Sequence, residues 1–372
     1  MGRGRQPRRP GPRTGDRVPL LARSVLTPLH IDVRRGAVAD LGAILADGRI
    51  SAGGDVAVVV GPGQGAQIAE LIRPSLRTAD VFTVAGATLD AADDLGGKLR
   101  ARSYDAVVGI GGGKTIDVAK YAATRRGLPM VSVATSLAND GIASPVASLI
   151  TDGIKGSYGV HIPIAVIVDL DFVESGPDRH NRAGIGDVIS NISALADWEL
   201  ARRVRGEPVD GLAASLARAG AEAVLNHPGD MTDDAFVIVL AEALISSGLA
   251  MAVDGTSRPC SGGCHEIMHA IDSLFPGTAS HGELAGLGAL FCTWLRGDLR
   301  RFGEMSACLA RHGLPRLPAE VALTDDQFVE AVQFAPRTRP DRYTILEHLA
   351  LSPTETRERL ADYAGAIRDQ LG

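Results

Sequence analysis

Short apolar runs alternate with helical patterns through the first half of the chain. Segments with helical spacing of apolar residues lie between several of these runs, for example residues 37–46, 66–73 and 115–125. Strands that alternate with helices indicate a parallel sheet that is covered on both faces. The predicted strands are residues 29–33, 56–60, 81–84, 106–110, 130–134 and 165–169.

The pattern changes near Gly184, after which the chain is almost entirely helical. We therefore predict an α/β N-terminal Rossmann-like domain with a parallel sheet at 21–182, and an all-helical C-terminal domain at 183–372. A cleft between two such domains is a common place for an active site. The predicted helices of the second domain are residues 187–205, 211–226, 233–251, 264–274, 282–300, 325–333 and 353–370.

Composition limits the class of protein. A net charge of −6 argues against broad nucleic-acid binding. The four cysteines complete no structural zinc pattern, so we expect a reduced, cytoplasmic protein. Residues 1–20 form a basic tail rich in proline and glycine, which we expect to be disordered. The apolar run at 235–253 contains Glu242 and two serines, which favours a buried helix over membrane insertion.

A glycine turn follows the strand predicted at 106–110. Gly111, Gly112 and Gly113 precede a helix, and glycines there let a phosphate approach the backbone N–H groups at the helix start. The spacing matches neither the Walker motif nor G-x-G-x-x-G. A tight turn without a ligand is the alternative, but the three glycines after a strong strand favour a pyrophosphate site. The loop at 134–145 follows the next strand and offers further hydroxyl groups.

The richest stretch for chemistry runs from Cys260 to Leu284. His265 and His269 are four residues apart, so a helix places both on one face, and His281 follows a Pro-Gly break. Three converging imidazoles indicate a divalent metal site. His265 to His269 also spells H-E-x-x-H, the zinc-peptidase signature, but the longer form of that motif is absent. Asp187 is placed by the pattern near a helix start, where it is either an N-cap or a fourth ligand.

Taken together, these segments resemble the iron-containing alcohol dehydrogenase and dehydroquinate synthase superfamily, and within it the sn-glycerol-1-phosphate dehydrogenases. They occur in family order over about three-quarters of the chain. The matching segments are GGGKTIDVAK at 111–120, the loop at 135–145, GIGDVISN at 184–191, SRPCSGGCHEIMHAID at 257–272, HGE at 281–283 and RYTIL at 342–346.

The resemblance implies a role for each matching residue. Asp187, His265 and His281 would bind one divalent metal ion, zinc by expectation, and His269 would lie on the substrate side. Asp140, Asp187 and His269 would be catalytic and contact the substrate. The residues implied to bind NADPH or NADH are Gly111, Gly112, Gly113, Lys114, Thr115, Asp117, Thr135, Ser136 and Ser144.

The activity implied is metal-dependent reduction of a small phosphorylated ketone by NAD(P)H, with dihydroxyacetone phosphate to sn-glycerol 1-phosphate as the leading case. Reduction of another phosphorylated ketone, a dehydroquinate synthase-like cyclase, the peptidase and a nucleotide-binding relic are the alternatives. For the phosphate, Lys155, Arg258 and Arg342 are candidates. We also expect a homo-oligomer with no nucleic-acid partner.

Two features of the sequence depart from the family pattern, and a third bears on the choice between NADH and NADPH. Cys264 stands where the family usually has an acidic residue before the ligand histidine, and the linker from His269 to His281 is short. The strand at 56–60 ends without the acidic residue that binds a ribose 2′-hydroxyl, so NADPH is allowed as well as NADH.

Overall fold

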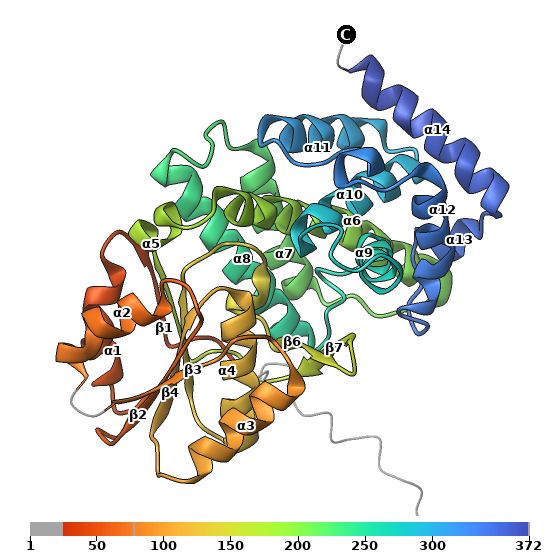
Figure 1. The fold of residues 1–372 in the computed structure, drawn as a ribbon. Helices are drawn as coiled ribbons and strands as arrows, with labels where there is room; N and C mark the ends of the chain where they lie inside the picture. Colours follow the sequence, from red (N-terminus) through yellow and green to blue (C-terminus); the bar gives the residue numbers. More distant parts are fainter. Residues whose placement is uncertain (1–24, 77–78, 371–372) are drawn as a thin grey trace, which may run out of the picture.

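A computed structural model describes residues 25–76 and 79–370 of the chain (Figure 1). The tail predicted at 1–20 lies outside these residues. A six-stranded sheet occupies the N-terminal part, in the order β1-β8-β5-β4-β2-β3, and all its neighbouring strands are parallel. Its strands are β1 (His30–Arg34), β2 (Val56–Val60), β3 (Ala79–Thr83), β4 (Ala106–Gly111), β5 (Met130–Ala134) and β8 (Ala165–Asp169).

Both faces of this sheet are buried, which explains its continuous apolar strands. Val58, Val60 and Ile110 belong to the core cluster beneath α1 and α2, whereas Val59 and Val107 belong to the cluster on the face of α3 and α4. The parallel sheet and the fold class are therefore confirmed. The helical elements of this part are η1 (Ala37–Asp40), α1 (Leu41–Leu45), α2 (Gly65–Ile72), η2 (Arg73–Ser75), α3 (Leu89–Arg100), α4 (Gly113–Arg126), η3 (Asp140–Ile142) and α5 (Leu170–Ser175).

A separate antiparallel hairpin lies beside the sheet and was not predicted. Its strands are β6 (Val146–Thr151) and β7 (Ile154–Gly159), joined by a turn at Asp152 and Gly153 that takes positive φ angles. The hairpin lies next to the C-terminal helices in Figure 1, and β7 packs against α9 (Gly263–Leu274).

The C-terminal part is helical throughout, as predicted. Two of the predicted helices differ from the structure by more than three residues. The first helix begins at Asp178, not at 187, so the expected domain boundary at 182 and 183 falls inside it. This first helix is α6 (Asp178–Arg205). The helices that follow it, together with α9, are α7 (Gly211–Asn226), α8 (Asp234–Asp254), α10 (His281–Leu295), α11 (Leu299–Arg311), η4 (Pro318–Val321), α12 (Asp325–Phe334), η5 (Ala335–Arg337), α13 (Ile345–Leu349) and α14 (Pro353–Asp369).

The helix predicted at 282–300 is in fact two helices. The chain turns at Gly297, which has a φ of 73°, and Asp298 then caps α11 by accepting a hydrogen bond from the N–H of Arg301 at 3.1 Å. A left-handed glycine followed by a capping aspartate ends one helix and starts the next.

Helix α8 is the one described helix that is long and apolar enough to cross a membrane, and 61% of its most apolar window is buried inside the protein. It packs against α7 and α6. Its placement agrees with the predicted buried helix.

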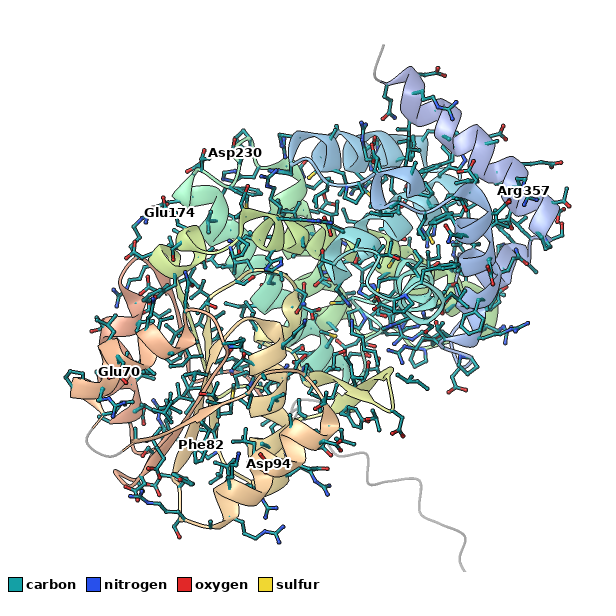
Figure 2. All side chains as sticks on the ribbon, viewed as in Figure 1. Glu70, Phe82, Asp94, Glu174, Asp230 and Arg357 are labelled. Carbon is teal, nitrogen blue, oxygen red and sulfur yellow. The ribbon has the colours of Figure 1, made fainter. Side chains whose placement is uncertain are left out.

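Charged side chains lie mainly around the outside, among them the labelled Glu70, Glu174 and Arg357 in Figure 2. One exposed group joins the two parts of the chain. Arg35, just after β1, pairs with Glu174 of α5 at 2.7 Å and with Asp234 of α8 at 2.6 Å.

Candidate metal and dinucleotide site

Three side chains from three helices converge on one point. The Oδ1 atom of Asp187 lies 3.5 Å from Nε2 of His265 and 3.3 Å from Nε2 of His281. One ligand atom from each residue lies within 4.8 Å of the others. One carboxylate and two imidazoles at this spacing are a donor set that fits a divalent ion such as zinc.

The surroundings of Asp187 favour its charged form. Burial raises the pKa of its carboxyl, but hydrogen bonds from His265 and His281 outweigh burial and lower the pKa below the usual range. Its second oxygen, Oδ2, accepts a hydrogen bond from the backbone N–H of Asp140 at 2.9 Å. Asp187 lies well inside α6, so the alternative of a helix N-cap is excluded.

Close contact between α6 and α10 brings Asp187 and His281 together. A Cβ on Gly186 would lie 2.2 Å from the carbonyl oxygen of Gly282, and one on Gly282 would lie 1.9 Å from the carbonyl oxygen of Ala183. The backbones touch only because both residues are glycine. The glycines that flank Asp187 and His281 thus set the distance between the two side chains.

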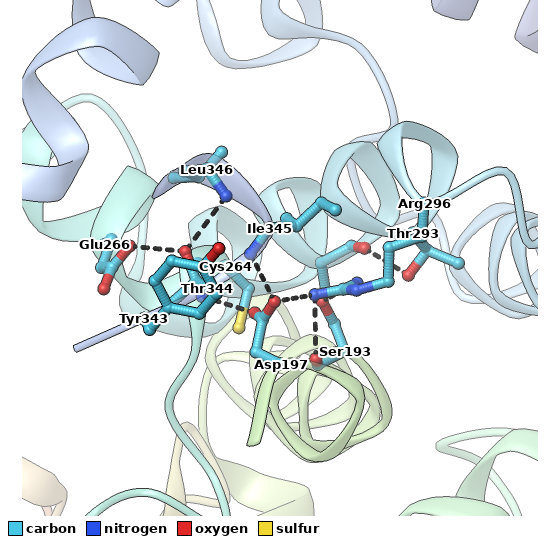
Figure 3. A network of polar contacts seen from close by, with 12 residues as sticks. Ser193, Asp197, Cys264, Glu266, Thr293, Arg296, Tyr343, Thr344, Ile345 and Leu346 are labelled. Atoms are coloured by element: carbon cyan, nitrogen blue, oxygen red, sulfur yellow. Dashed lines mark hydrogen bonds and ion pairs between the residues drawn. The ribbon is translucent and has the colours of Figure 1, made fainter. Parts of the chain in front are cut away.

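A buried polar network fixes α9, the helix that carries His265 (Figure 3). Asp197 of α6 is fully buried, and its Oδ2 accepts a hydrogen bond from the N–H of Gly263, the first residue of α9, at 2.8 Å. Its Oδ1 pairs with Arg296 at 2.5 Å and accepts a hydrogen bond from the N–H of Ile345 at 2.8 Å. The carboxylate therefore anchors the N-termini of α9 and α13 to the helix that holds Asp187.

His269 lies outside the candidate metal site formed by Asp187, His265 and His281. Its ring centroid lies 6.5 Å from that of His265, and its Nε2 accepts a hydrogen bond from Nη2 of Arg339 at 3.2 Å. Burial, followed by the charge of Arg339, lowers the pKa of His269 well below its ordinary value. The imidazole is therefore neutral near pH 7.

The arrangement differs from that of a zinc peptidase, in which Glu266 would activate water at the metal. The Oε2 atom of Glu266 accepts a hydrogen bond from Oγ1 of Thr344 at 3.1 Å (Figure 3). Burial and the neighbouring Glu347 raise its pKa to about 9, so it is protonated near pH 7 and unsuited to act as a base. Cys264, the departure from the family pattern, places its Sγ 3.4 Å from Nδ1 of His265.

The glycine turn joins β4 to α4. Gly111 has a φ of 155°, and a Cβ there would lie 2.9 Å from Thr115. Gly112 and Gly113 have no such crowding, so a phosphate has room to approach the N–H groups at the start of α4. Lys114 is exposed beside the turn.

The predicted cofactor residues differ in their surroundings. Ser136 places its Cβ 3.9 Å from the Cβ position of Gly112, and its buried hydroxyl has no protein partner, which suits a ligand. Thr135 is mostly buried, and its N–H donates to the carbonyl of Gly111 at 3.1 Å. Ser144 donates to the carbonyl of Val146 at 3.3 Å.

The side chains of two other predicted cofactor residues, Thr115 and Asp117, already have partners within the protein. Thr115 packs against Gly61 and Gly111. Asp117 is buried, pairs with Lys120 at 3.0 Å and accepts a hydrogen bond from the N–H of Ser148 at 3.0 Å. Both side chains thus hold the turn and the hairpin together.

Sequence reasoning missed Lys120, which is fully buried in α4. Its ammonium donates to the carbonyls of Gly141 at 2.7 Å and Ser144 at 3.2 Å. Lys120 thereby fixes the loop at 134–145, in which Asp140 is half-buried. Burial and the charge of Asp187 raise the pKa of Asp140 to about 8.

The three candidates for a phosphate contact lie around α9. Lys155 pairs with Asp272 at 3.1 Å, Arg258 pairs with Glu207 at 2.6 Å, and Arg342 donates to Oγ of Ser257 at 2.5 Å. None of the three contacts His269, whereas Arg339, which was not predicted, does.

Known proteins share this fold. A family described as "Iron-containing alcohol dehydrogenase" matches residues 32–177. A probable glycerol dehydrogenase from Sinorhizobium meliloti superposes with a TM-score of 0.75 at 20% identity, covering 93% of this chain and 99% of that chain. The glycerol dehydrogenase of Schizosaccharomyces pombe gives 0.73 at 21% identity, covering 94% of this chain and 93% of that chain.

Relatives with higher sequence identity than these solved structures carry the name glycerol-1-phosphate dehydrogenase. The glycerol-1-phosphate dehydrogenase [NAD(P)+] of Hyperthermus butylicus is 39% identical over 91% of this chain and 98% of its own length. That of Pyrococcus furiosus is 37% identical over 86% of this chain and 93% of its own. With this likeness along nearly the whole chain, the protein belongs to the glycerol-1-phosphate dehydrogenase family of the iron-containing alcohol dehydrogenases.

Proposed function

We propose that this chain is a metal-dependent dehydrogenase that reduces dihydroxyacetone phosphate to sn-glycerol 1-phosphate with NADPH or NADH. The observation that carries the proposal is the group of Asp187, His265 and His281 beside a glycine turn with room for a pyrophosphate. The names of its close relatives support the same substrate and cofactor class.

The donor set supports zinc as the resident ion, held by Asp187, His265 and His281. When bound, such an ion polarises a ketone carbonyl as a Lewis acid. The protein contributes alignment, because the glycine turn and the metal group both contact the loop at 134–145. The N–H of Thr135 bonds Gly111, and the N–H of Asp140 bonds Asp187.

His269 is suited to move a proton to the reduced carbonyl oxygen. Its ring lies one helical turn from His265, and its depressed pKa keeps the imidazole neutral. A neutral imidazole accepts a proton at one nitrogen and donates one from the other, so it relays a proton without adding charge beside Arg339. In this proposal Asp140 contacts a substrate hydroxyl group.

Oxidation of NADPH and NADH with dihydroxyacetone phosphate, followed by nicotinamide absorbance, tests the proposal. Chelation with EDTA or dipicolinate should abolish turnover, and added zinc should restore it. The product should not be a substrate for sn-glycerol-3-phosphate dehydrogenase, which accepts only the other enantiomer. Nucleotide binding without net oxidation would instead favour another phosphorylated ketone or a dehydroquinate synthase-like cyclase, which uses NAD transiently.

Two further expectations belong to this proposal. All four cysteines are free and buried, which supports a reducing, cytoplasmic location. A homo-oligomer is also part of the proposal, and sedimentation velocity of the purified protein would test it.

A further inference from the structure

We infer that Arg339 binds the phosphate of the substrate and so determines the specificity of the enzyme for phosphorylated ketones. The inference rests on the proposed function. Arg339 follows η5, and its Nη2 donates to Nε2 of His269 at 3.2 Å and to Oγ of Ser157 at 3.3 Å. It therefore lies at the proton-relay histidine, between the C-terminal segment and the β6–β7 hairpin.

The guanidinium of Arg339 has no carboxylate partner among the residues that the structure describes. Its Nε is buried and has no hydrogen-bond partner. By contrast, Arg258 pairs with Glu207 and Arg296 pairs with Asp197. The side chain of Arg339 is only partly exposed, and a cation that is partly withdrawn from water without a counter-charge is costly, so an anionic ligand is the partner that would compensate it.

Two other cations, Arg342 and Lys155, lie near the same point, and of these Lys155 is paired with Asp272. The pKa of Arg342 is lowered to about 10, chiefly by burial and secondly by the positive charge of the neighbouring Arg339. Lys155 and Arg339 both act on the pKa of His269. The nearby carboxyl group of Glu266, which is protonated near pH 7, bonds Thr344 rather than Arg339. The local charge thus favours an anion even though the whole chain carries a net charge of −6.

The position of Arg339 suits the dimensions of the substrate. In dihydroxyacetone phosphate one methylene and one ester oxygen separate the carbonyl carbon from phosphorus. The ring of His269 lies 6.5 Å from that of His265, and Arg339 contacts Nε2 of His269. A carbonyl held at the metal group would therefore direct its phosphate toward the guanidinium, whose planar fork matches two phosphate oxygens.

The test compares substrates with and without the phosphate. Arg339→Gln should raise KM for dihydroxyacetone phosphate at least about tenfold, since charge-assisted hydrogen bonds are lost. The kcat/KM for unphosphorylated dihydroxyacetone should fall by a smaller factor than that for dihydroxyacetone phosphate, since only the contact with His269 is lost there, and the bound-metal content should not change. Arg339→Lys, which keeps the charge but loses the fork, should fall between Gln and wild type. Arg337→Gln is the matched control, because Arg337 is exposed in the same segment.

Equal losses on both substrates, or an unchanged KM for the phosphorylated one, would overturn the inference. Inorganic phosphate binding, measured by calorimetry on metal-loaded protein with NADPH, gives a second readout that needs no turnover. Arg339-dependent phosphate binding in a wild-type protein that does not reduce dihydroxyacetone phosphate would refute the proposed function and leave the anion site standing. Turnover of dihydroxyacetone phosphate together with phosphate binding that does not depend on Arg339 would support the proposed function and refute the anion site at Arg339.

Discussion

Gly186→Ala should weaken the metal site without altering any ligand. The new Cβ would lie 2.2 Å from the carbonyl oxygen of Gly282, in the residue next to His281. An unstrained carbon–oxygen contact is about 3.3 Å, so α6 and α10 must separate by roughly 1 Å. Metal–ligand distances tolerate only about 0.2 Å, so Asp187 and His281 could no longer both reach one ion without further rearrangement.

We expect Gly186→Ala to lower the free energy of unfolding by about 1–3 kcal/mol, as overpacking does. Metal affinity should fall about 10–100-fold, similar to the loss when the support of a ligand is removed. Competition with a chromogenic zinc chelator measures the affinity, and urea unfolding of the metal-free protein measures the stability.

Gly303→Ala is the matched control for this experiment. Gly303 also lies inside a helix, α11, but a Cβ there meets nothing within 4 Å. The substitution should stabilise the protein by about 0.5–1 kcal/mol and leave metal affinity unchanged. Wild-type zinc affinity in Gly186→Ala would refute the view that the crossing of α6 and α10 sets the ligand geometry.

Five other substitutions test separate parts of the structure. His265→Ala should lose bound metal by elemental analysis, whereas His269→Ala should keep the metal and lose about 10²–10⁴ in kcat; metal loss in His269→Ala would favour the peptidase-like arrangement. Lys120→Met should raise KM for NADPH by loosening the loop at 134–145, and an unchanged KM would show that the loop holds its shape without the ammonium. Asp197→Asn should lower stability by about 3–5 kcal/mol in urea unfolding, because it leaves a buried arginine unpaired; a loss below 1 kcal/mol would contradict the anchoring role. Burial lowers the pKa of His312 to about 4, so the unfolded chain takes up the proton more readily, and stability should fall as pH drops from about 6.5 toward 4. His312→Phe should reduce that slope between pH 7 and 5, and an identical slope would exclude His312 as its source.

Periodicity predicted the parallel sheet, because strand and helix signals are local in sequence. The local motif grouped His265, His269 and His281, and only the family resemblance replaced His269 by the distant Asp187, which the structure places beside the other two. The start of α6 could not be predicted in the same way. Gly184 and Gly186 suggest a helix end when only the sequence is considered. In the structure they lie inside α6, where Cβ atoms would collide with the backbones of Leu137 and Gly282. Glycine is required at both positions by contacts with distant parts of the chain, and the local sequence pattern does not reveal such contacts.

Arg339 and Lys120 were missed for a related reason. Each is one basic residue among many, and such residues are usually exposed. Lys120 is buried by carbonyl groups about twenty residues later in the chain, and Arg339 meets His269 seventy residues away in sequence. The β6–β7 hairpin has few fully buried positions, so its alternation of polar and apolar residues is weak.

The hydrogen bond from the N–H of Asp140 to Asp187 has a thermodynamic consequence. The loop at 134–145 contacts the glycine turn at its start, through Thr135, and the candidate metal ligand Asp187 at its middle, through Asp140. Ordering of the loop by one bound ligand would therefore prepare it for the second. Linkage then requires reciprocity: whatever factor the metal adds to NADPH affinity, NADPH adds to metal affinity, typically about 5–150-fold where two sites are coupled. A cell that is short of the metal ion would then retain it best in enzyme molecules that hold nucleotide.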